Sequence, residues 1–312
     1  MLKPRIVFMG TPEFAVASLE ALVRGGCDIA AVITAPDKPA GRGMQVTESA
    51  VKKFAKQHSL NLLQPEKLKN EQFINELKLL NADMFVVVAF RMLPEIVWNM
   101  PPMGTINLHG SMLPQYRGAA PINWAIINGE KETGVTTFKL THEIDTGNIL
   151  LSQTIPIGDD ETAGELHDRM KMIGAALLLK TVEGVANNTL LEIPQTRLIA
   201  DSGKEIKHAP KLFSDTCSID WTKSVQEIHN LVRGLSPYPG AFTRLKGKSL
   251  KIYRTGKNSN QPSIAQGEYE TDHKTYLRFA ASDGFIEVRT LQLEGKKRIE
   301  VEEFLRGWRE DA

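Results

Sequence analysis

Residues 84–89, Met-Phe-Val-Val-Val-Ala, form an apolar run rich in β-branched and aromatic side chains. Because no polar residue alternates with them, this run is typical of a parallel strand that is covered on both faces. Two further short apolar runs, 5–10 and 29–33, flank a helical pattern at residues 14–22. This β-α-β order predicts an α/β fold with a Rossmann-like, largely parallel sheet in the N-terminal part of the chain.

The connections between these elements carry their own signals. We expect Thr11 to cap the first helix, with Pro12 at its first position. The turn before that helix lacks the three glycines of a dinucleotide fingerprint, so we predict neither a nicotinamide nor a flavin cofactor. Residues 35–43 contain two prolines and two glycines. We therefore predict a surface loop there, with neither helix nor strand.

Composition sets outer limits on the kind of protein. A length of 312 residues suggests about two domains, and 42% hydrophobic with 24% charged residues is ordinary for a soluble protein. No apolar run approaches the roughly 18 residues of a membrane span. We expect no signal peptide, no membrane association and a cytoplasmic location, with Cys27 and Cys217 as reduced thiols.

The second half of the chain changes character. Thr162 and Glu165 form a capping box that predicts a long helix. We interpret residues 1–189 as a catalytic domain, 190–210 as a linker, and 211–312 as a domain of short strands that suggests a small barrel. The formal net charge of +1 does not favour nucleic acid, but residues 244–257 contain six basic residues and no acidic one. This stretch is either a nucleic-acid surface or a solvated basic face.

The stretch 104–121 contains the polar residues of greatest interest. Asn107 and His109 lie two apart on an expected strand, so both side chains should project from one face at its end. Asp145 follows in a loop whose Thr-Gly sequence favours a turn. Taken singly, these residues could be a polar strand end and a turn-former. We predict no metal site at His142, because no second ligand stands at suitable spacing.

The run from Asn107 to Pro114, Asn-Leu-His-Gly-Ser-Met-Leu-Pro, followed by Arg-Gly-Ala-Ala-Pro at 117–121, resembles the signature of the folate-dependent formyltransferases. The resemblance implies formyl transfer from 10-formyltetrahydrofolate to an amine, an OB-like C-terminal barrel, and Asn107, His109 and Asp145 as catalytic residues. Asn107 would stabilise the oxyanion, and His109 would donate a proton or N–H. Asp145 would hold the tautomer and charge of His109 and help to take the amine proton.

The same resemblance implies a folate pocket around the motif. Phe90-Arg91 departs from the Tyr-Gly that most relatives carry, and backbone groups there would bind the pterin ring. The expected folate-binding residues are Phe14, Ala89, Arg91, Leu93, Ser111, Met112, Leu113, Pro114 and Gly118.

The resemblance extends over the whole chain to those members that formylate initiator Met-tRNA, and implies that a basic loop near residue 40 holds the tRNA acceptor end. The expected tRNA-binding residues are Lys38, Arg42, Lys207, Lys246, Lys248 and Lys251. We expect a monomer. The alternatives are a formyltransferase for a small-molecule amine, such as an amino-sugar nucleotide, and a non-catalytic RNA-binding protein. The motif at 104–121 does not exclude the first, and the intact trio argues against the second.

Overall fold

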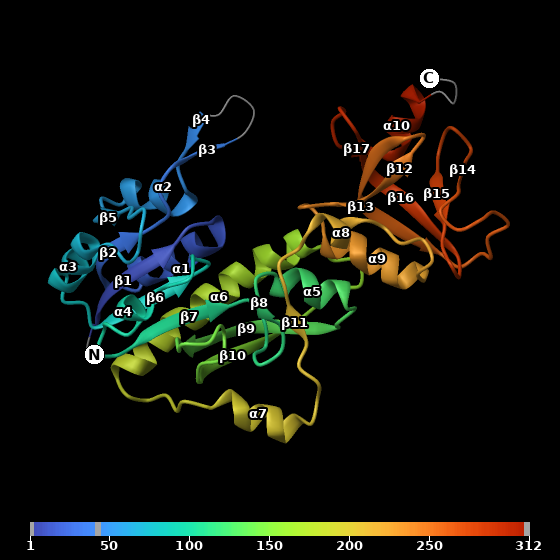
Figure 1. Ribbon diagram of the computed structural model, residues 1–312. Helices are drawn as coiled ribbons and strands as arrows, with labels where there is room; N and C mark the ends of the chain where they lie inside the picture. Colours follow the sequence, from blue (N-terminus) through green and yellow to red (C-terminus); the bar gives the residue numbers. More distant parts are fainter. Residues whose placement is uncertain (1–2, 41–44, 309–312) are drawn as a thin grey trace. The chain divides into compact units, whose positions relative to one another are not determined.

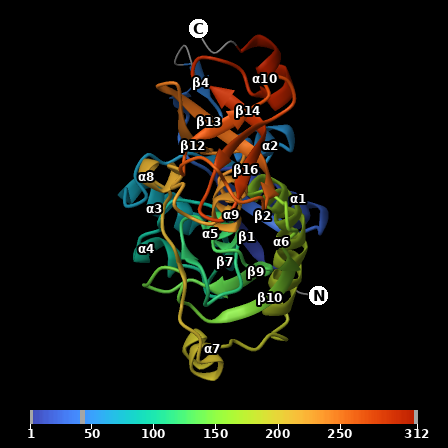
Figure 2. The ribbon, with the colours of Figure 1, turned by 90° about the vertical axis from the view of Figure 1, so that its right-hand side faces the viewer.

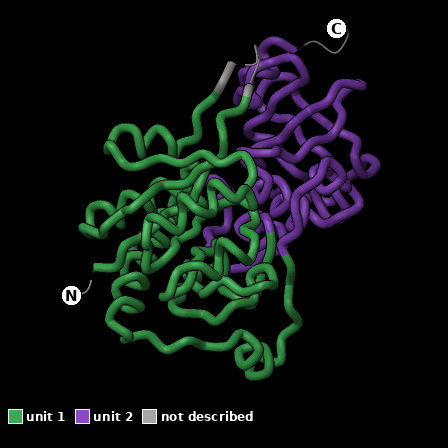
Figure 3. The backbone as a smooth tube through the Cα atoms, turned by 60° about the vertical axis from the view of Figure 1, so that its left-hand side comes forward, with its two compact units in different colours: residues 1–118, 134–155, 167–208 green, residues 119–133, 156–166, 209–312 purple. Residues whose placement is uncertain are grey.

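The computed structural model describes residues 3–40 and 45–308. Two compact units divide the chain, and each is assembled from separate segments (Figure 3). The first contains residues 1–118, 134–155 and 167–208, and the second contains residues 119–133, 156–166 and 209–312. Residues 119–133 and 156–166, which we assigned to the catalytic domain, therefore pack with the C-terminal part. The functional domain boundaries remain a prediction.

A seven-stranded sheet organises the first unit, with the strand order β10-β9-β7-β6-β1-β2-β5 (Figure 1). The strands from β7 to β5 in this order are parallel, whereas β9 is antiparallel to β7. The elements up to the end of this sheet are β1 (Arg5–Gly10), α1 (Glu13–Arg24), β2 (Asp28–Ile33), β3 (Lys38–Ala40), β4 (Gln45–Thr47), α2 (Ala50–Gln57), β5 (Leu62–Leu63), α3 (Glu71–Leu79), β6 (Met84–Val88), α4 (Glu95–Trp98), β7 (Thr105–His109), β8 (Arg117–Gly118), α5 (Pro121–Ile127), β9 (Glu132–Lys139) and β10 (Ile149–Pro156).

Helices cover both faces of this sheet, as the apolar run of β6 predicted. Helices α3 and α4 lie on one face, and α1 lies with α6 (Ala163–Ala186) on the other (Figure 2). All five residues of β6 are buried. Burial on both faces explains why the strand contains only apolar side chains.

The second unit has its own antiparallel sheet, in the order β12-β13-β16-β15-β14 with β17 beside β16. This curled sheet is consistent with an OB-like barrel, and its apolar side chains form a core of their own with helix α9. The remaining elements of the chain are α7 (Gln195–Ser202), β11 (His208–Ala209), α8 (Ser214–Cys217), α9 (Val225–Gly234), β12 (Ala241–Leu245), β13 (Lys248–Asn258), β14 (Tyr269–Thr271), β15 (Leu277–Ala280), β16 (Phe285–Leu293), β17 (Ile299–Glu300) and α10 (Val301–Gly307).

Two local predictions are wrong. Helix α1 begins at Glu13 with Pro12 as its N-cap and no side-chain cap, so Thr11 does not cap it. Residues 38–40 form strand β3, which pairs with β4, although we expected no strand there. A two-stranded ribbon has only edge strands, so the missing N–H of Pro39 need not interrupt a ladder on both sides. The predicted linker at 190–210 also contains structure, namely helix α7 and strand β11.

Candidate active site

The carboxyl ends of three neighbouring parallel strands define the site region. Gly10 of β1 pairs with Val88 of β6, and Val88 pairs with Leu108 of β7, so these strands end at the same edge. This edge is where open α/β sheets bind ligands. Two expected folate-binding residues follow these strand ends: Phe14 is buried in the first turn of α1, and Ala89 has a left-handed φ of 47° directly after β6.

Strand β7 presents Asn107 and His109 on one face of the sheet. The side chain of Leu108, between them, lies against Gly174 of α6 on the opposite face. His109 is 7% exposed, and Asn107 is partly buried. Among the described residues, none hydrogen-bonds to the side-chain amide of Asn107. Within the described part of the chain, the side-chain amide that we predicted to stabilise the oxyanion therefore has no hydrogen-bond partner.

The two ring nitrogens of His109 face different partners. The Nε2 atom lies 2.9 Å from the carbonyl oxygen of Tyr116. A carbonyl can only accept, so Nε2 carries the hydrogen, and Nδ1 is the nitrogen left for chemistry. Nδ1 lies 3.7 Å from Oδ2 of Asp145, which is longer than a hydrogen bond. We expected Asp145 to hold the tautomer of His109, but the Tyr116 carbonyl does so.

The loop between β9 and β10 places Asp145 beside this histidine. Its Oδ2 accepts the backbone N–H of Gly118 at 2.9 Å, and its side chain is only 12% exposed. Asp145 itself has a left-handed φ of 55°, a conformation that aspartate tolerates better than most residues. Gly147 ends the turn so close to β9 that a Cβ atom there would lie 1.7 Å from the carbonyl oxygen of Lys139. The loop therefore requires glycine at 147.

Two residues that sequence reasoning did not assign to the site support this loop. Gln195, which is 2% exposed, donates its amide hydrogens to the carbonyls of Asp145 and Gly147, both at 2.8 Å. Its Oε1 accepts Nε and Nη2 of Arg117 at 3.1 and 2.7 Å. Burial lowers the pKa of Arg117, and the nearby carboxylates of Asp145 and Glu143 oppose that shift. A lone glutamine in a polar segment gave no sequence signal of this role.

The loop after β7 is held by Thr136 of the neighbouring strand. The Thr136 hydroxyl donates to the carbonyl of Ser111 at 2.7 Å and accepts the N–H of Leu113 at 3.2 Å. The Ser111 hydroxyl donates to the carbonyl of Gln115 at 2.6 Å. The peptide bond between Leu113 and Pro114 is cis. Among the expected folate residues here, Ser111 and Leu113 are buried, and Met112, Pro114 and Gly118 are partly buried.

The Arg91 side chain bonds to the segment that follows β5, and not to the Asp145 loop. Its guanidinium donates to the carbonyls of Pro65 and Glu66, and burial lowers its pKa. Leu93 packs in the core under α3 and α4. The role of Ala89, Arg91 and Leu93 toward folate stays a prediction, and Nε of Arg91 is buried without a hydrogen-bond partner among the described residues.

The expected tRNA contacts in the first unit differ in what can be said of them. Lys38 is exposed on β3, and Arg42 lies outside the described residues. Lys207 is exposed, while its backbone is bound on both sides: its N–H donates to Gln115 Oε1 at 2.9 Å and its carbonyl accepts the N–H of Tyr116 at 2.6 Å.

The expected tRNA contacts of the second unit also differ from one another. Lys246 places its ammonium 5.3 Å from the ring centre of Trp308, a cation–π distance. Lys248 is exposed at the start of β13. Lys251 donates to the carbonyl of Pro239 at 2.9 Å. These side chains therefore do not form a uniform row of solvated charges.

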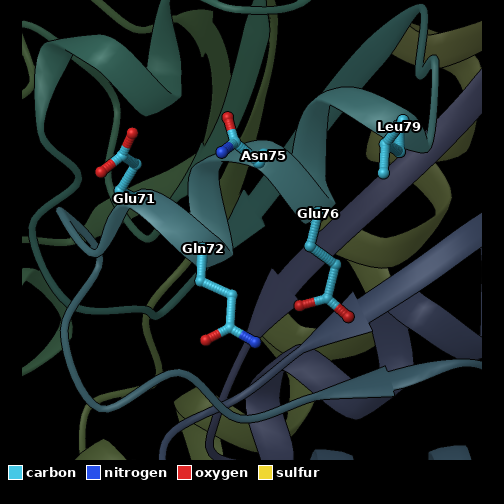
Figure 4. A pocket seen from close by; sticks show the side chains of 5 residues that line it. All are labelled: Glu71, Gln72, Asn75, Glu76 and Leu79. Carbon is cyan, nitrogen blue, oxygen red and sulfur yellow. The ribbon is translucent and has the colours of Figure 1, made fainter.

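Other features of the described chain do not compete with this site. A shallow pocket on helix α3 is lined by Glu71, Gln72, Asn75, Glu76 and Leu79, none of which is a predicted site residue (Figure 4). Within residues 3–40 and 45–308, no three His, Cys, Asp or Glu side chains are grouped to hold a metal ion. Over the same residues, no helix is both long and apolar enough to span a membrane.

Comparison with known proteins gives consistent matches over nearly the whole chain. Residues 4–182 match the family model described as "Formyl transferase", and residues 211–309 match "Formyl transferase, C-terminal domain". The chain is 54% identical to the methionyl-tRNA formyltransferase of Phocaeicola vulgatus over 311 residues, covering 98% of this chain and 96% of that relative. It is 52% identical to the methionyl-tRNA formyltransferase of Parabacteroides distasonis over 314 residues, covering 99% and 97%.

A solved N-formyltransferase from Helicobacter canadensis, in complex with folinic acid and dTDP-3-aminofucose, is similar in fold. Its TM-score is 0.64 at 22% identity, over 92% of this chain and 99% of that one. At that identity the likeness concerns the fold alone.

Proposed function

The chain belongs to the formyl transferase family, and from that membership we propose that it formylates initiator Met-tRNA for translation initiation. The formyl group would come from 10-formyltetrahydrofolate and the acceptor would be the α-amino group of the methionyl ester. The observation that carries the proposal is the approach of His109 Nδ1 to Asp145 Oδ2, at 3.7 Å, on the face of β7 that also presents Asn107. We also infer a monomer that works in the cytoplasm, where its tRNA substrate is used.

The reaction needs a neutral amine, because only the lone pair of nitrogen attacks the formyl carbon. An α-amino group has a reference pKa of about 8, so a useful fraction is neutral at pH 7. As the carbon–nitrogen bond forms, the formyl oxygen gains negative charge, and the unengaged amide of Asn107 would donate to it. Since the side-chain amide of Asn107 has no other hydrogen-bond partner among the described residues, no hydrogen bond to those residues must break before it donates to the oxyanion.

Two proton movements complete the transfer. The attacking amine must lose a proton, and the folate nitrogen that leaves must gain one. With Nε2 of His109 bound to the Tyr116 carbonyl, Nδ1 is the atom that would carry or deliver a proton. Asp145 would stabilise the charged imidazole and accept the amine proton directly or through water. The Gly118 N–H keeps the carboxylate turned toward this position.

A substrate comparison tests the proposal. Purified protein with 10-formyltetrahydrofolate labelled in the formyl group should transfer the label to Met-tRNA. Label on an amino-sugar nucleotide, with none on Met-tRNA, would favour the alternative instead. The 22% identity to a sugar enzyme supports only the shared fold. A further variant, Arg42→Ala, should impair the reaction with Met-tRNA while folate binding is unchanged; equal loss of both would assign that loop to folate or to folding.

A further inference from the structure

Gln195 occupies an unusual position for a polar side chain in the first unit. It is 2% exposed, it begins helix α7, and it lies 50 residues from Asp145 in the sequence. A buried amide is costly unless its hydrogen-bonding groups are satisfied. Here both hydrogens of Nε2 are donated and Oε1 accepts twice from Arg117, so the side chain has used its full capacity.

The bonds made by Gln195 hold the backbone of the Asp145 loop. They end on the carbonyls of Asp145 and Gly147, which flank Thr146, and Asp145 has a left-handed φ of 55°. Such a conformation persists only when its surroundings fix it. The N–H of Gly118 fixes the Asp145 carboxylate, while Gln195 fixes its backbone. The loop is thus bound at two points, its side chain and its backbone.

Arg117 fixes Gln195 in turn. Its Nε and Nη2 converge on Oε1, which orients the amide so that Nε2 faces the loop and not the reverse. Arg117 is next in sequence to Gly118, whose N–H binds the Asp145 carboxylate, so both supports of Asp145 start from strand β8. These hydrogen bonds therefore link strand β8, helix α7 and the Asp145 loop to one another.

We propose that Gln195 is a positioning residue for the reaction, which holds the Asp145 loop in its reactive geometry by bracing it against Arg117. This inference rests on the proposed function, because the readout is formyl transfer. Gln195 need not touch substrate. It acts by keeping the Asp145 carboxylate within reach of His109 Nδ1, and misplacement of a catalytic group by about 1 Å can cost about 10²-fold in rate.

The first test is Gln195→Ala. We expect kcat to fall about 10- to 100-fold, while the KM values for folate and Met-tRNA change by less than about threefold. Arg197→Ala is the matched control, since Arg197 lies on the same helix with an exposed side chain. It should leave both constants unchanged. A rise in KM without a fall in kcat would overturn the positioning role.

A double-mutant cycle separates positioning from general stability. If Gln195 acts through Asp145, then Gln195→Ala in an Asp145→Asn background should lower single-turnover rates by less than about twofold further. Losses that multiply in full would overturn the inference. If wild-type protein transfers no formyl group to Met-tRNA, the proposed function fails instead, so the two failures are distinct.

Gln195→Glu keeps the test decisive if the alanine variant does not fold. It retains the size of the side chain and an acceptor for Arg117, but replaces the donor that faces the two carbonyls. We expect its kcat to fall as in Gln195→Ala, with a folded circular-dichroism spectrum. A glutamate variant with the wild-type kcat would show that these donated bonds do not position Asp145.

Discussion

The loop of Asp145 and strand β13 were both predicted to be functional, and they are constructed in opposite ways. At the loop, the Asp145 side chain is only 12% exposed, and the buried Gln195 that supports it uses all of its hydrogen-bonding capacity. On β13, Lys248 is exposed and Lys251 makes one bond to a carbonyl. Chemistry requires groups held to a fraction of an ångström, whereas attraction of a polyanion requires only charge near a surface. The difference predicts effects on kcat in one region and on affinity in the other.

The largest effect should come from the proposed catalytic pair, His109 and Asp145. We expect Asp145→Asn to lower kcat by about 10²-fold or more, because the amide cannot accept the amine proton or stabilise a charged His109. Asparagine has the same shape, so thermal unfolding should stay near wild type. A variant whose rate stays within a few-fold of wild type would remove Asp145 from the mechanism.

His109→Ala should lower kcat as strongly, but with a second effect. The structure buries His109 to 7% exposure, so its side chain also contributes to packing. The alanine variant leaves a cavity and loses the hydrogen bond to the Tyr116 carbonyl, which together cost about 1–3 kcal/mol of unfolding free energy. Denaturant unfolding and steady-state kinetics on one preparation separate the two effects. Unchanged kcat would exclude His109 as the proton carrier.

Gly147→Ala tests the loop without altering any catalytic side chain. A Cβ atom 1.7 Å from the Lys139 carbonyl cannot be accommodated, so the loop must move and carry Asp145 with it. We expect kcat to fall about tenfold or more. Gly307→Ala at the end of α10 is the control, because neither glycine has a left-handed backbone and no atom lies within 4 Å of the carbon added at 307. Equal behaviour of the two variants would show that the close approach to Lys139 does not decide the effect.

How far the sequence predicts this site depends on the range of the interactions. Asn107 and His109 share a face because strand periodicity is local, and that prediction needs only residues two apart. The meeting of His109 with Asp145 depends on the length and register of a hairpin, which only the family resemblance could supply. Gln195 acts over 50 residues through a single side chain, so no periodicity or spacing marks it.

The fold, like the site, is predictable from the sequence where it depends on residues that are close together in the chain. Helix α3 spans residues 71–79, because Asn70 caps it and its apolar face has the helical repeat. The β3–β4 pairing was missed because proline and glycine content predicts loops well but says nothing about a ribbon of edge strands. Local chemistry thus predicts elements, while contacts between elements need the folded chain.

On β13, the structure sharpens the expectation for the basic residues. Lys248→Gln should flatten the dependence of log Kd for Met-tRNA on log salt by about one, because an exposed lysine near phosphate releases about one counterion. Lys251→Gln should change that slope less, since its ammonium is bound to the Pro239 carbonyl. Binding titrations at several salt concentrations measure both slopes. If a triple variant at 246, 248 and 251 keeps the wild-type slope, the patch is only a solvated face.

The smallest effect concerns the other buried histidine, His229 of α9, which should affect stability and not catalysis. Burial lowers its pKa, Lys257 and Arg233 lower it further, and Asp160, whose Oδ1 lies 3.1 Å from Nε2, opposes them. Its Nδ1 lies 2.8 Å from the Thr255 hydroxyl. The folded protein therefore holds this imidazole neutral at a pH where the unfolded chain would already be protonated. The stability it contributes is present above pH ~6.5 and is lost as the pH falls through the folded pKa.

A pH series of unfolding tests this sign. Between pH 7 and pH 5, the free energy of unfolding of wild type should fall with a contribution from His229 of at most about 1.4 kcal/mol per pH unit. His229→Gln keeps a hydrogen-bonding group for Thr255 but cannot titrate, so its unfolding should depend less on pH across the same range. Its kcat at neutral pH should equal that of wild type, in contrast to any change at His109. Carboxylates with lowered pKa values, such as Glu227, lose their contribution only at more acidic pH and do not obscure this window. Equal pH slopes in the variant and wild type would mean that His229 has the same pKa in the folded protein and in the unfolded chain. Its burial would then not disfavour the protonated form.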